Sequence, residues 1–459
     1  MSQATTCSER VVGYDVVVLG AGLAGLVAAA RAAEAGASVG IVALASGGLN
    51  LWSGLVSAQR SLFDAEGVED GGRDSVGADR TEAGRPGRGP ASGWTAAETA
   101  ESARFFAAVT GRAGLPYLSA SPASFTVLSP AGNPITCSML PASAAAGDLT
   151  LWGGGQESGG GLLIAGFTEL GDYPAGLISA RAASRTGNRV IYRSFSLGAA
   201  VGRGLAPRLA NLFDDRTWFR SFLDLSRRVL GPEARQVAAV AFPPVLGVYR
   251  FTQNLQDLAE NLGCPVFELP ALPPSVPGQR FWRLWRHHLE RGGRTTFHLG
   301  SRVVEARVQG GRCLWVADWH RRYEGAAFVL ATGGVAGGGL EVPPGSLLAQ
   351  DDVPTAGAGS GRPENPREPV FGLATWGHGR DWLSWGVRTD SDLRPYPDGA
   401  ATEPLGNVFA AGWQLGGANV SGAAASIFTA WRAGGLAAAA AGATDGTIPA
   451  ASTRTEERG

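Results

Sequence analysis

A glycine turn between a buried strand and a helix constrains this chain more than any other feature. Residues 14–19 (YDVVVL) are almost all apolar and mostly β-branched, as in a strand buried on both faces of a parallel sheet. The turn Gly20-x-Gly22-x-x-Gly25 follows at once, and the alanine-rich residues after it favour a helix that ends near Gly36. With a second buried strand at 37–44, the pattern predicts a βαβ unit of about thirty residues.

Each glycine of this turn has its own physical reason. Gly20 permits the tight turn, Gly22 lets backbone amides approach a pyrophosphate, and Gly25 lets the helix pack against the strand. Leu23 and Ala24 begin the helix, whose N-terminus points the positive end of its dipole at phosphates. In this context the turn predicts a dinucleotide-type site, and the alternative is a strand–helix turn that binds nothing.

Two more glycine turns follow strands far downstream. Residues 326–334 (AAFVLATGG) and 407–417 (NVFAAGWQLGG) each bring bare backbone to the C-terminal end of a strand, where open α/β sheets bind ligands. Together with the first turn they predict one discontinuous flavin-binding domain. The residues that we expect to contact the cofactor in these two turns are Thr332, Gly333, Gly412, Gly416 and Gly417.

The acidic residue that normally ends the second strand of such a unit, and binds the ribose hydroxyls, is missing. Ala43 occupies its position. The adenosine contact is therefore weakened, supplied by Ser46 or by backbone, or absent. This leaves both FAD and FMN open as the flavin and disfavours nicotinamide as the primary ligand.

Composition excludes several other classes of protein. The chain has 39 basic and 40 acidic residues, so it lacks the basic excess of a nucleic-acid-binding protein. It has no lysine, which rules out Schiff-base chemistry and a P-loop. The four cysteines form no CxxC pair, so we expect no metal site. No apolar run is long enough to span a membrane, and residues 1–10 carry no secretory signal, so we expect a cytoplasmic protein.

The same patterns divide the chain into five parts. Residues 12–62 form the first segment of the flavin-binding domain, and residues 63–95, rich in Gly, Arg and Asp, predict a flexible insertion. Residues 96–290 mix helices with short strands and predict an inserted α+β cap on the substrate side. Residues 291–440 return to the flavin-binding domain, and residues 441–459 predict a disordered tail.

The three glycine turns resemble the FAD-binding fold of the fumarate reductase and succinate dehydrogenase flavoprotein superfamily. A narrower resemblance rests on residues 272–280 (LPPSVPGQR), together with 46–54 (SGGLNLWSG) and 385–390 (WGVRTD). This succession is similar to the B subunits of anaerobic glycerol-3-phosphate dehydrogenases. The fold that it implies is α/β, with a Rossmann-like FAD-binding (GR2-type) discontinuous domain and an inserted cap domain.

The resemblance also implies a function. It implies a flavin-dependent oxidoreductase component that takes part in oxidising sn-glycerol 3-phosphate to dihydroxyacetone phosphate, with electrons passed to quinone. The implied partners are a catalytic flavoprotein (the A subunit) and an iron–sulfur protein (the C subunit), which holds the complex at the inner face of the cell membrane. The family's flavin is usually FMN, which fits Ala43. The flavin ring is expected near the 412–417 turn and near Ser46, Gly47, Gly48, Leu49, Ser53 and Gly54.

Two residues are candidates for catalytic roles. His378 lies in a glycine-flanked segment and could act as the base in alcohol oxidation, or it could be a surface histidine beside an arginine. Arg280 could clamp a phosphate or carboxylate, because its planar guanidinium fits such groups, or it could be a surface arginine at a helix start.

Two alternative functions remain open at this stage. The chain could be a non-catalytic flavin-binding protein needed for assembly, which the missing acid at Ala43 and the few candidate bases favour. It could also be a stand-alone oxidoreductase that resembles fumarate reductase or ketosteroid dehydrogenase, although no matching acid–base set is evident.

Overall fold

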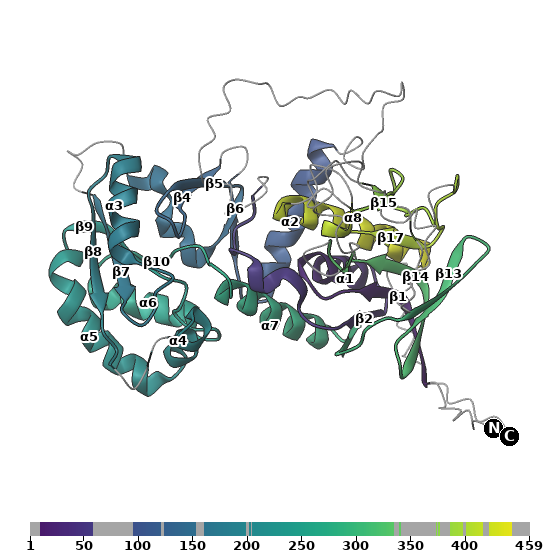
Figure 1. Ribbon diagram of the computed structural model, residues 1–459, viewed down its shortest axis with the longest axis horizontal. Helices are drawn as coiled ribbons and strands as arrows, with labels where there is room; N and C mark the ends of the chain where they lie inside the picture. Colours follow the sequence, from purple (N-terminus) through teal and green to yellow (C-terminus); the bar gives the residue numbers. More distant parts are fainter. Residues whose placement is uncertain are drawn as a thin grey trace, which may run out of the picture. The chain divides into compact units, whose positions relative to one another are not determined.

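The computed structural model describes residues 10–57, 95–120, 124–152, 160–198, 202, 204–334, 339–340, 373, 375–376, 386–397, 401–415 and 422–442. The chain forms two compact units, each built from several segments (Figure 1). Unit 1 comprises Met1–Gly48, Val68–Phe106 and Arg286–Gly459. Unit 2 comprises Leu49–Gly67 and Ala107–Trp285. Most of the expected insertion (63–95) and of the expected tail (441–459) lies outside the described residues.

Unit 1 is built on a seven-stranded sheet with the order β11-β2-β1-β14-β13-β12, in which β17 also pairs with β14. Strands β11, β2, β1, β14 and β17 run parallel, whereas β13 and β12 are antiparallel additions. The strands are β1 (Arg10–Leu19), β2 (Val39–Ala43), β11 (Thr295–Leu299), β12 (Glu305–Gln309), β13 (Arg312–Ala317), β14 (Arg321–Leu330) and β17 (Val408–Ala410).

The first βαβ unit forms as predicted. Valines 16–18 of β1 are fully buried, and helix α1 (Leu23–Glu34) connects β1 to β2. Helix α8 (Ala423–Ala440) packs closely on α1, since a Cβ at Gly434 would lie 2.4 Å from the carbonyl oxygen of Ala28. Alanine and glycine therefore let two helices share one face of the sheet (Figure 1).

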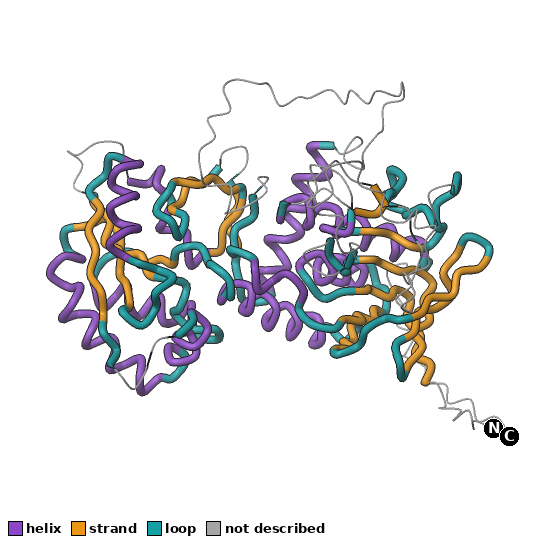
Figure 2. Tube along the Cα trace, viewed as in Figure 1, coloured by secondary structure: helices purple, strands orange, loops and turns teal. Residues whose placement is uncertain are grey.

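Unit 2 has its own four-stranded parallel sheet, with the order β10-β9-β7-β8 (Figure 2). A cluster of phenylalanines from its strands and helices, including Phe167, Phe213 and Phe222, fills its core. The strands are β7 (Gly161–Phe167), β8 (Val190–Phe195), β9 (Val237–Phe242) and β10 (Val266–Glu268). The helices are α3 (Ala175–Thr186), α4 (Ala206–Phe213), α5 (Arg216–Ala234) and α6 (Phe251–Leu262).

Shorter elements complete the two units. Two antiparallel ribbons, β3 (Tyr117–Ser119) with β6 (Met139–Pro141) and β4 (Phe125–Leu128) with β5 (Pro134–Cys137), belong to unit 2. The remaining elements are the 3-10 helices η1 (Gly47–Leu51), η3 (Ala142–Gly147), η4 (Leu149–Trp152) and η6 (Gly412–Gln414), the ribbon β15 (Thr375–Trp376) with β16 (Gly386–Val387), and the helices α2 (Ala96–Arg112) and α7 (Val276–Arg291). Among the described residues, none of the helices is both long and apolar enough to cross a membrane.

Candidate functional site

The ends of three parallel strands of unit 1 lie side by side. Strand β14 runs between β1 and β17, and its end is hydrogen-bonded to both neighbours. The amide of Ala331 donates to the carbonyl of Leu19 at 2.8 Å, and the amide of Ala411 donates to the carbonyl of Leu330 at 2.9 Å. The three glycine turns that follow these strands therefore begin at one edge of one sheet, where open α/β sheets bind ligands.

Packing against the protein itself explains two of the three glycines in the first turn. Gly20 has φ +108°, and a Cβ there would lie 2.2 Å from the carbonyl oxygen of Ala331. A Cβ at Gly25 would lie 1.9 Å from the carbonyl oxygen of Gly20. At Gly22, in contrast, the nearest atoms would be 4.0 Å away. The described neighbours thus leave room for a side chain at position 22, and the approach of a ligand to Gly22 stays a prediction.

The N-terminus of α1 is not capped by a side chain. Its N-cap residue is Gly22, and its first turn contains no acidic residue. The first amides of a helix have no partner within the helix, and they carry the positive end of its dipole. Leu23 and Ala24, which lie in this first turn, are only half-buried. Among the described residues no side chain caps these amides, so they could accept an anion.

The loop after β2 lies beside the first turn. Gly47 has φ +59°, and a Cβ there would lie 3.2 Å from the Cα of Gly22. Ala43 is the last residue of β2, is buried, and its carbonyl accepts from the amide of Ser301 at 3.2 Å. The next residue, Leu44, is 65% exposed. The end of β2 therefore offers no carboxylate for a ribose and instead exposes an apolar side chain.

The third turn packs directly on the first helix. Gly412 has φ +69°, and a Cβ there would lie 2.6 Å from the Cβ of Ala24. Its amide donates to Thr429 Oγ1 at 3.0 Å, which attaches the turn to α8. The Thr332 hydroxyl donates to Gln414 Oε1, so a side-chain hydrogen bond also ties the β14 turn to the β17 turn. Gln414 is buried.

Three predicted cofactor contacts, Leu49, Ser53 and Gly54, belong to unit 2 rather than to unit 1. Gly54 has φ +89°, and a Cβ there would lie 2.9 Å from the Cβ of Pro277. A Cβ at Gly278 would lie 1.8 Å from the carbonyl oxygen of Leu49. The distinctive segment 272–280 therefore supports the 49–54 loop within unit 2. The contact of this loop with a flavin stays a prediction.

Arg280 is buried, so the alternative of a surface arginine is wrong, and its role as a clamp for substrate stays a prediction. The residue is 1% exposed, and its two terminal nitrogens donate to the two oxygens of Glu268, at 2.5 and 2.8 Å. Its Nε donates to the carbonyl of Gly247 at 2.7 Å, and the guanidinium lies 4.4 Å from the ring centroid of Phe251. The guanidinium thus binds a carboxylate of its own chain, and substrate would have to displace that carboxylate. We therefore treat Arg280 as a structural residue of unit 2.

Three other predicted site residues, His378, Gly416 and Gly417, lie outside the described residues. Among the residues that the structure describes, no group of three or more His, Cys, Asp and Glu side chains could hold a metal ion.

His298 belongs to a polar cluster on the sheet of unit 1. Its Nε2 lies 2.7 Å from the Tyr14 hydroxyl, and its Nδ1 lies 3.3 Å from a nitrogen of Arg321. Because arginine can only donate, Nδ1 must accept, so the neutral ring carries its proton on Nε2 and donates to Tyr14. Burial lowers the pKa of His298, and the Arg321 charge lowers it further.

Sequence reasoning missed Asn407, which begins the third glycine segment. Its side chain is fully engaged: Oδ1 accepts from the amide of Cys313, and Nδ2 donates to the carbonyls of Cys313 and Ala326. The residue is buried and joins β13, β14 and β17. The one available signal was an asparagine directly before a buried strand. This signal does not identify the strands to which its side chain binds.

Comparisons with known proteins agree with this geometry. A family model described as "FAD binding domain" matches residues 15–196. A relative from Halobacterium salinarum, named as a probable B subunit of anaerobic glycerol-3-phosphate dehydrogenase, is 30% identical over 93% of this chain and 98% of its own length. A relative from Pectobacterium atrosepticum, named as the B subunit of the same enzyme, is 25% identical over 88% of this chain and 92% of its own.

A solved structure of a flavocytochrome c3 fumarate reductase is similar at 12% identity. The match covers 95% of this chain and 80% of that one, with a TM-score of 0.39. The assignment to a family depends on the Halobacterium salinarum relative, which is 30% identical over 93% of this chain.

Proposed function

This chain belongs to the family of anaerobic glycerol-3-phosphate dehydrogenase B subunits, and from that membership we propose that it is the flavin-binding component of a quinone-linked glycerol-3-phosphate dehydrogenase. The expected α/β, Rossmann-like FAD-binding fold is confirmed, and the chain is one subunit of a flavin-dependent oxidoreductase. The observation that best supports the proposal is the meeting of three glycine turns beside an uncapped helix N-terminus. Glycerol 3-phosphate as substrate and quinone as acceptor belong to the proposal.

The residues present fit the phosphate end of a flavin. We propose that the amides of residues 20–25 bind the phosphate, with Gly22 allowing the close approach, and that Gly47, Gly48, Thr332 and Gly333 line the path toward the ring. A bound flavin would accept two reducing equivalents from a substrate and pass them on singly or in a pair. Ala43 offers nothing to a ribose, so backbone–phosphate contacts have to supply much of the affinity.

The four loops around the site contain no titratable side chain. Residues 20–25, 46–48, 331–334 and 410–415 consist of Gly, Ala, Leu, Ser, Thr, Trp and Gln. A base for alcohol oxidation must therefore come from another segment, and His378 stays our proposal for it. This absence favours a second candidate function, in which the chain holds a flavin and relays electrons, or stabilises the complex, while a partner protein oxidises the substrate.

The relatives are named as one component of a larger enzyme, which implies partner proteins. We propose that these are a catalytic flavoprotein (the A subunit) and an iron–sulfur protein (the C subunit) at the membrane. In that arrangement this chain would lie in the cytoplasm, at the inner face of the membrane.

An anaerobic reduction experiment tests the proposal. The flavin-loaded chain is mixed with glycerol 3-phosphate, the visible flavin absorbance is followed, and a quinone analogue is then added. We expect bleaching by substrate and recovery with quinone. Bleaching by light but not by substrate would instead establish the second candidate. A chain that takes up neither FAD nor FMN would contradict both.

A further inference from the structure

A strained turn holds the end of β17, two residues before Gly412. The turn spans residues 390–394, and the carbonyl of its Leu393 accepts from the amide of Ala410 at 2.8 Å. Leu393 has φ +62° and is fully buried. A leucine rarely adopts this left-handed conformation, so the surrounding contacts must enforce it.

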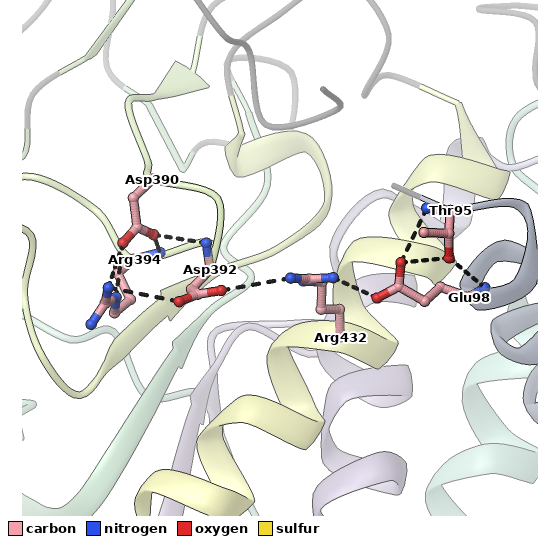
Figure 3. A network of polar contacts seen from close by, with 6 residues as sticks. All are labelled: Thr95, Glu98, Asp390, Asp392, Arg394 and Arg432. Atoms are coloured by element: carbon pink, nitrogen blue, oxygen red, sulfur yellow. Dashed lines mark hydrogen bonds and ion pairs between the residues drawn. The ribbon is translucent and has the colours of Figure 1, made fainter. Parts of the chain in front are cut away.

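Asp390 supplies those contacts. Its Oδ1 accepts from the amides of Asp392 and Arg394, at 3.0 and 2.8 Å, and its Oδ2 accepts from Arg394 Nε at 2.9 Å (Figure 3). The amide of Leu393 donates to the carbonyl of Asp390 at 3.1 Å. One carboxylate thus fixes both the backbone of the turn and the side chain beside it.

Helix α8 holds the same strand end from another side. Thr429 Oγ1 accepts from the amide of Gly412, and Arg432 follows three residues later, on the same face of the helix. Arg432 reaches Asp392 at 3.6 Å and Glu98 at 2.7 Å (Figure 3). A closed ring of contacts therefore runs from the β17 turn through α8 to Arg432, on to the 390–394 turn, and back to Ala410.

Glu98 orients Arg432 from the start of α2. Its Oε2 accepts from the amide and hydroxyl of Thr95, at 3.1 and 2.8 Å, and its amide donates to Thr95 Oγ1 at 3.1 Å. This is a capping box, which fixes the first turn of α2. The other oxygen, Oε1, is the one that binds Arg432. Both partners of Arg432 are thus carboxylates on segments held in place by local hydrogen bonds.

We propose that Arg432 and Asp392 are positioning residues of the flavin site, which set the place of the β17 turn through this ring of contacts. The inference rests on the proposed function, since it assumes that the 412 turn contacts a flavin. Neither residue touches the β17 turn directly. Arg432 acts through α8 and Thr429, and Asp392 acts through Leu393 and Ala410. Any shift of this ring of contacts would therefore move the backbone of the β17 turn, which we propose faces the flavin.

The partial exposure of Arg432 and Asp392 distinguishes a positioning role from a role in stability alone. The side chains of Arg432 and Asp392 are 22% and 47% exposed, and ion pairs in such settings contribute little to global stability. If this ring of contacts only stabilised the fold, its loss would change Tm little and would not change flavin binding. If it positions the turn, its loss changes how the flavin is held while the fold remains.

The test compares Asp392→Asn and Arg432→Met, singly and together, with wild type. The measured quantities are the flavin dissociation constant, the visible circular dichroism of the bound flavin, and Tm. Arg286→Met is the matched control, because Arg286 is also in unit 1 and pairs with Glu290 at 2.8 Å on an exposed helix face. Arg432→Lys is the conservative variant, which retains the charge but cannot bridge two carboxylates with one planar group.

We expect each single variant to weaken flavin binding about 5- to 20-fold, the low end of typical coupling between sites, and to change the flavin's circular dichroism. The double variant should lose little more than one single variant, because both break the same ring. Arg432→Lys should recover part of the affinity, and Arg286→Met should resemble wild type. Folded variants with unchanged flavin affinity and spectrum would overturn the inference. A wild type that binds no flavin would instead overturn the proposed function.

Discussion

Gly22 and Gly25 lie three residues apart in one turn, yet the packing around them differs. A Cβ at Gly25 would lie 1.9 Å from the carbonyl oxygen of Gly20, whereas a Cβ at Gly22 would have no atom closer than 4.0 Å. Packing therefore requires Gly25, whereas the protein has room for a side chain at Gly22. The sequence motif alone predicts ligand approach at Gly22 and close packing at Gly25. Only the surrounding atoms show that Gly22 can be substituted without disturbing the packing.

Gly22→Ala should therefore leave the fold intact and weaken flavin binding. The added methyl group has room in the protein but would stand where we propose that the phosphate approaches. The measurement is a flavin titration combined with Tm, and Gly13→Ala in β1, where a Cβ would meet nothing within 4 Å, is the matched control. In contrast, Gly25→Ala should lower the free energy of unfolding by about 3 kcal/mol. Equal flavin affinity in Gly22→Ala and wild type would contradict the assignment.

Arg280→Met should lower the free energy of unfolding of unit 2 by about 3–5 kcal/mol, because it leaves the Glu268 carboxylate buried without its partner. Arg280→Lys should not restore stability, since an ammonium cannot reproduce the two parallel hydrogen bonds. Urea unfolding measures the change, and Arg286→Met is the exposed control. A stable, folded Arg280→Met chain that lost only its affinity for substrate would instead support the substrate clamp.

At the scale of elements, the strands of unit 1 were easier to predict than those of unit 2. Strand β1, α1 and β2 follow one another with a glycine signature, so their pairing could be inferred. The strands of unit 2 are short and pair in an order different from their order in the sequence, which periodicity does not reveal. Asn407 illustrates the same limit, because its three hydrogen bonds join strands that lie 81 to 94 residues away.

The His298 cluster, which joins β11, β1 and β14, should make the stability of unit 1 depend on pH. Burial and Arg321 lower the pKa of His298 in the folded chain, so the unfolded chain binds the proton more readily. The contribution to stability is therefore full above about pH 6.5, the unfolded value, and declines as the pH falls toward the folded pKa.

Urea unfolding between pH 5 and pH 8 checks this expectation. In His298→Gln the decline below about pH 6.5 should be smaller, because that proton can no longer bind. His287→Gln, at an exposed position on α7, is the control substitution. If the two variants had the same pH profile, the His298 cluster would not be the source of the decline.

At the scale of the whole molecule, segments more than 300 residues apart form one edge of one sheet. The turns after Leu19, Leu330 and Ala410 could be placed together from the sequence because each follows a buried strand with the same kind of glycine signal. The buried position of Arg280 could not, since it depends on Glu268 and Gly247, which carry no signal of their own.

The proposed function depends most on a flavin being held by these three turns. Titrating the purified chain with FAD and with FMN, and identifying by mass any flavin released on denaturation, tests this directly. We expect one flavin per chain, with a rise in Tm when it binds. A folded chain that releases no flavin and binds neither one would contradict the account.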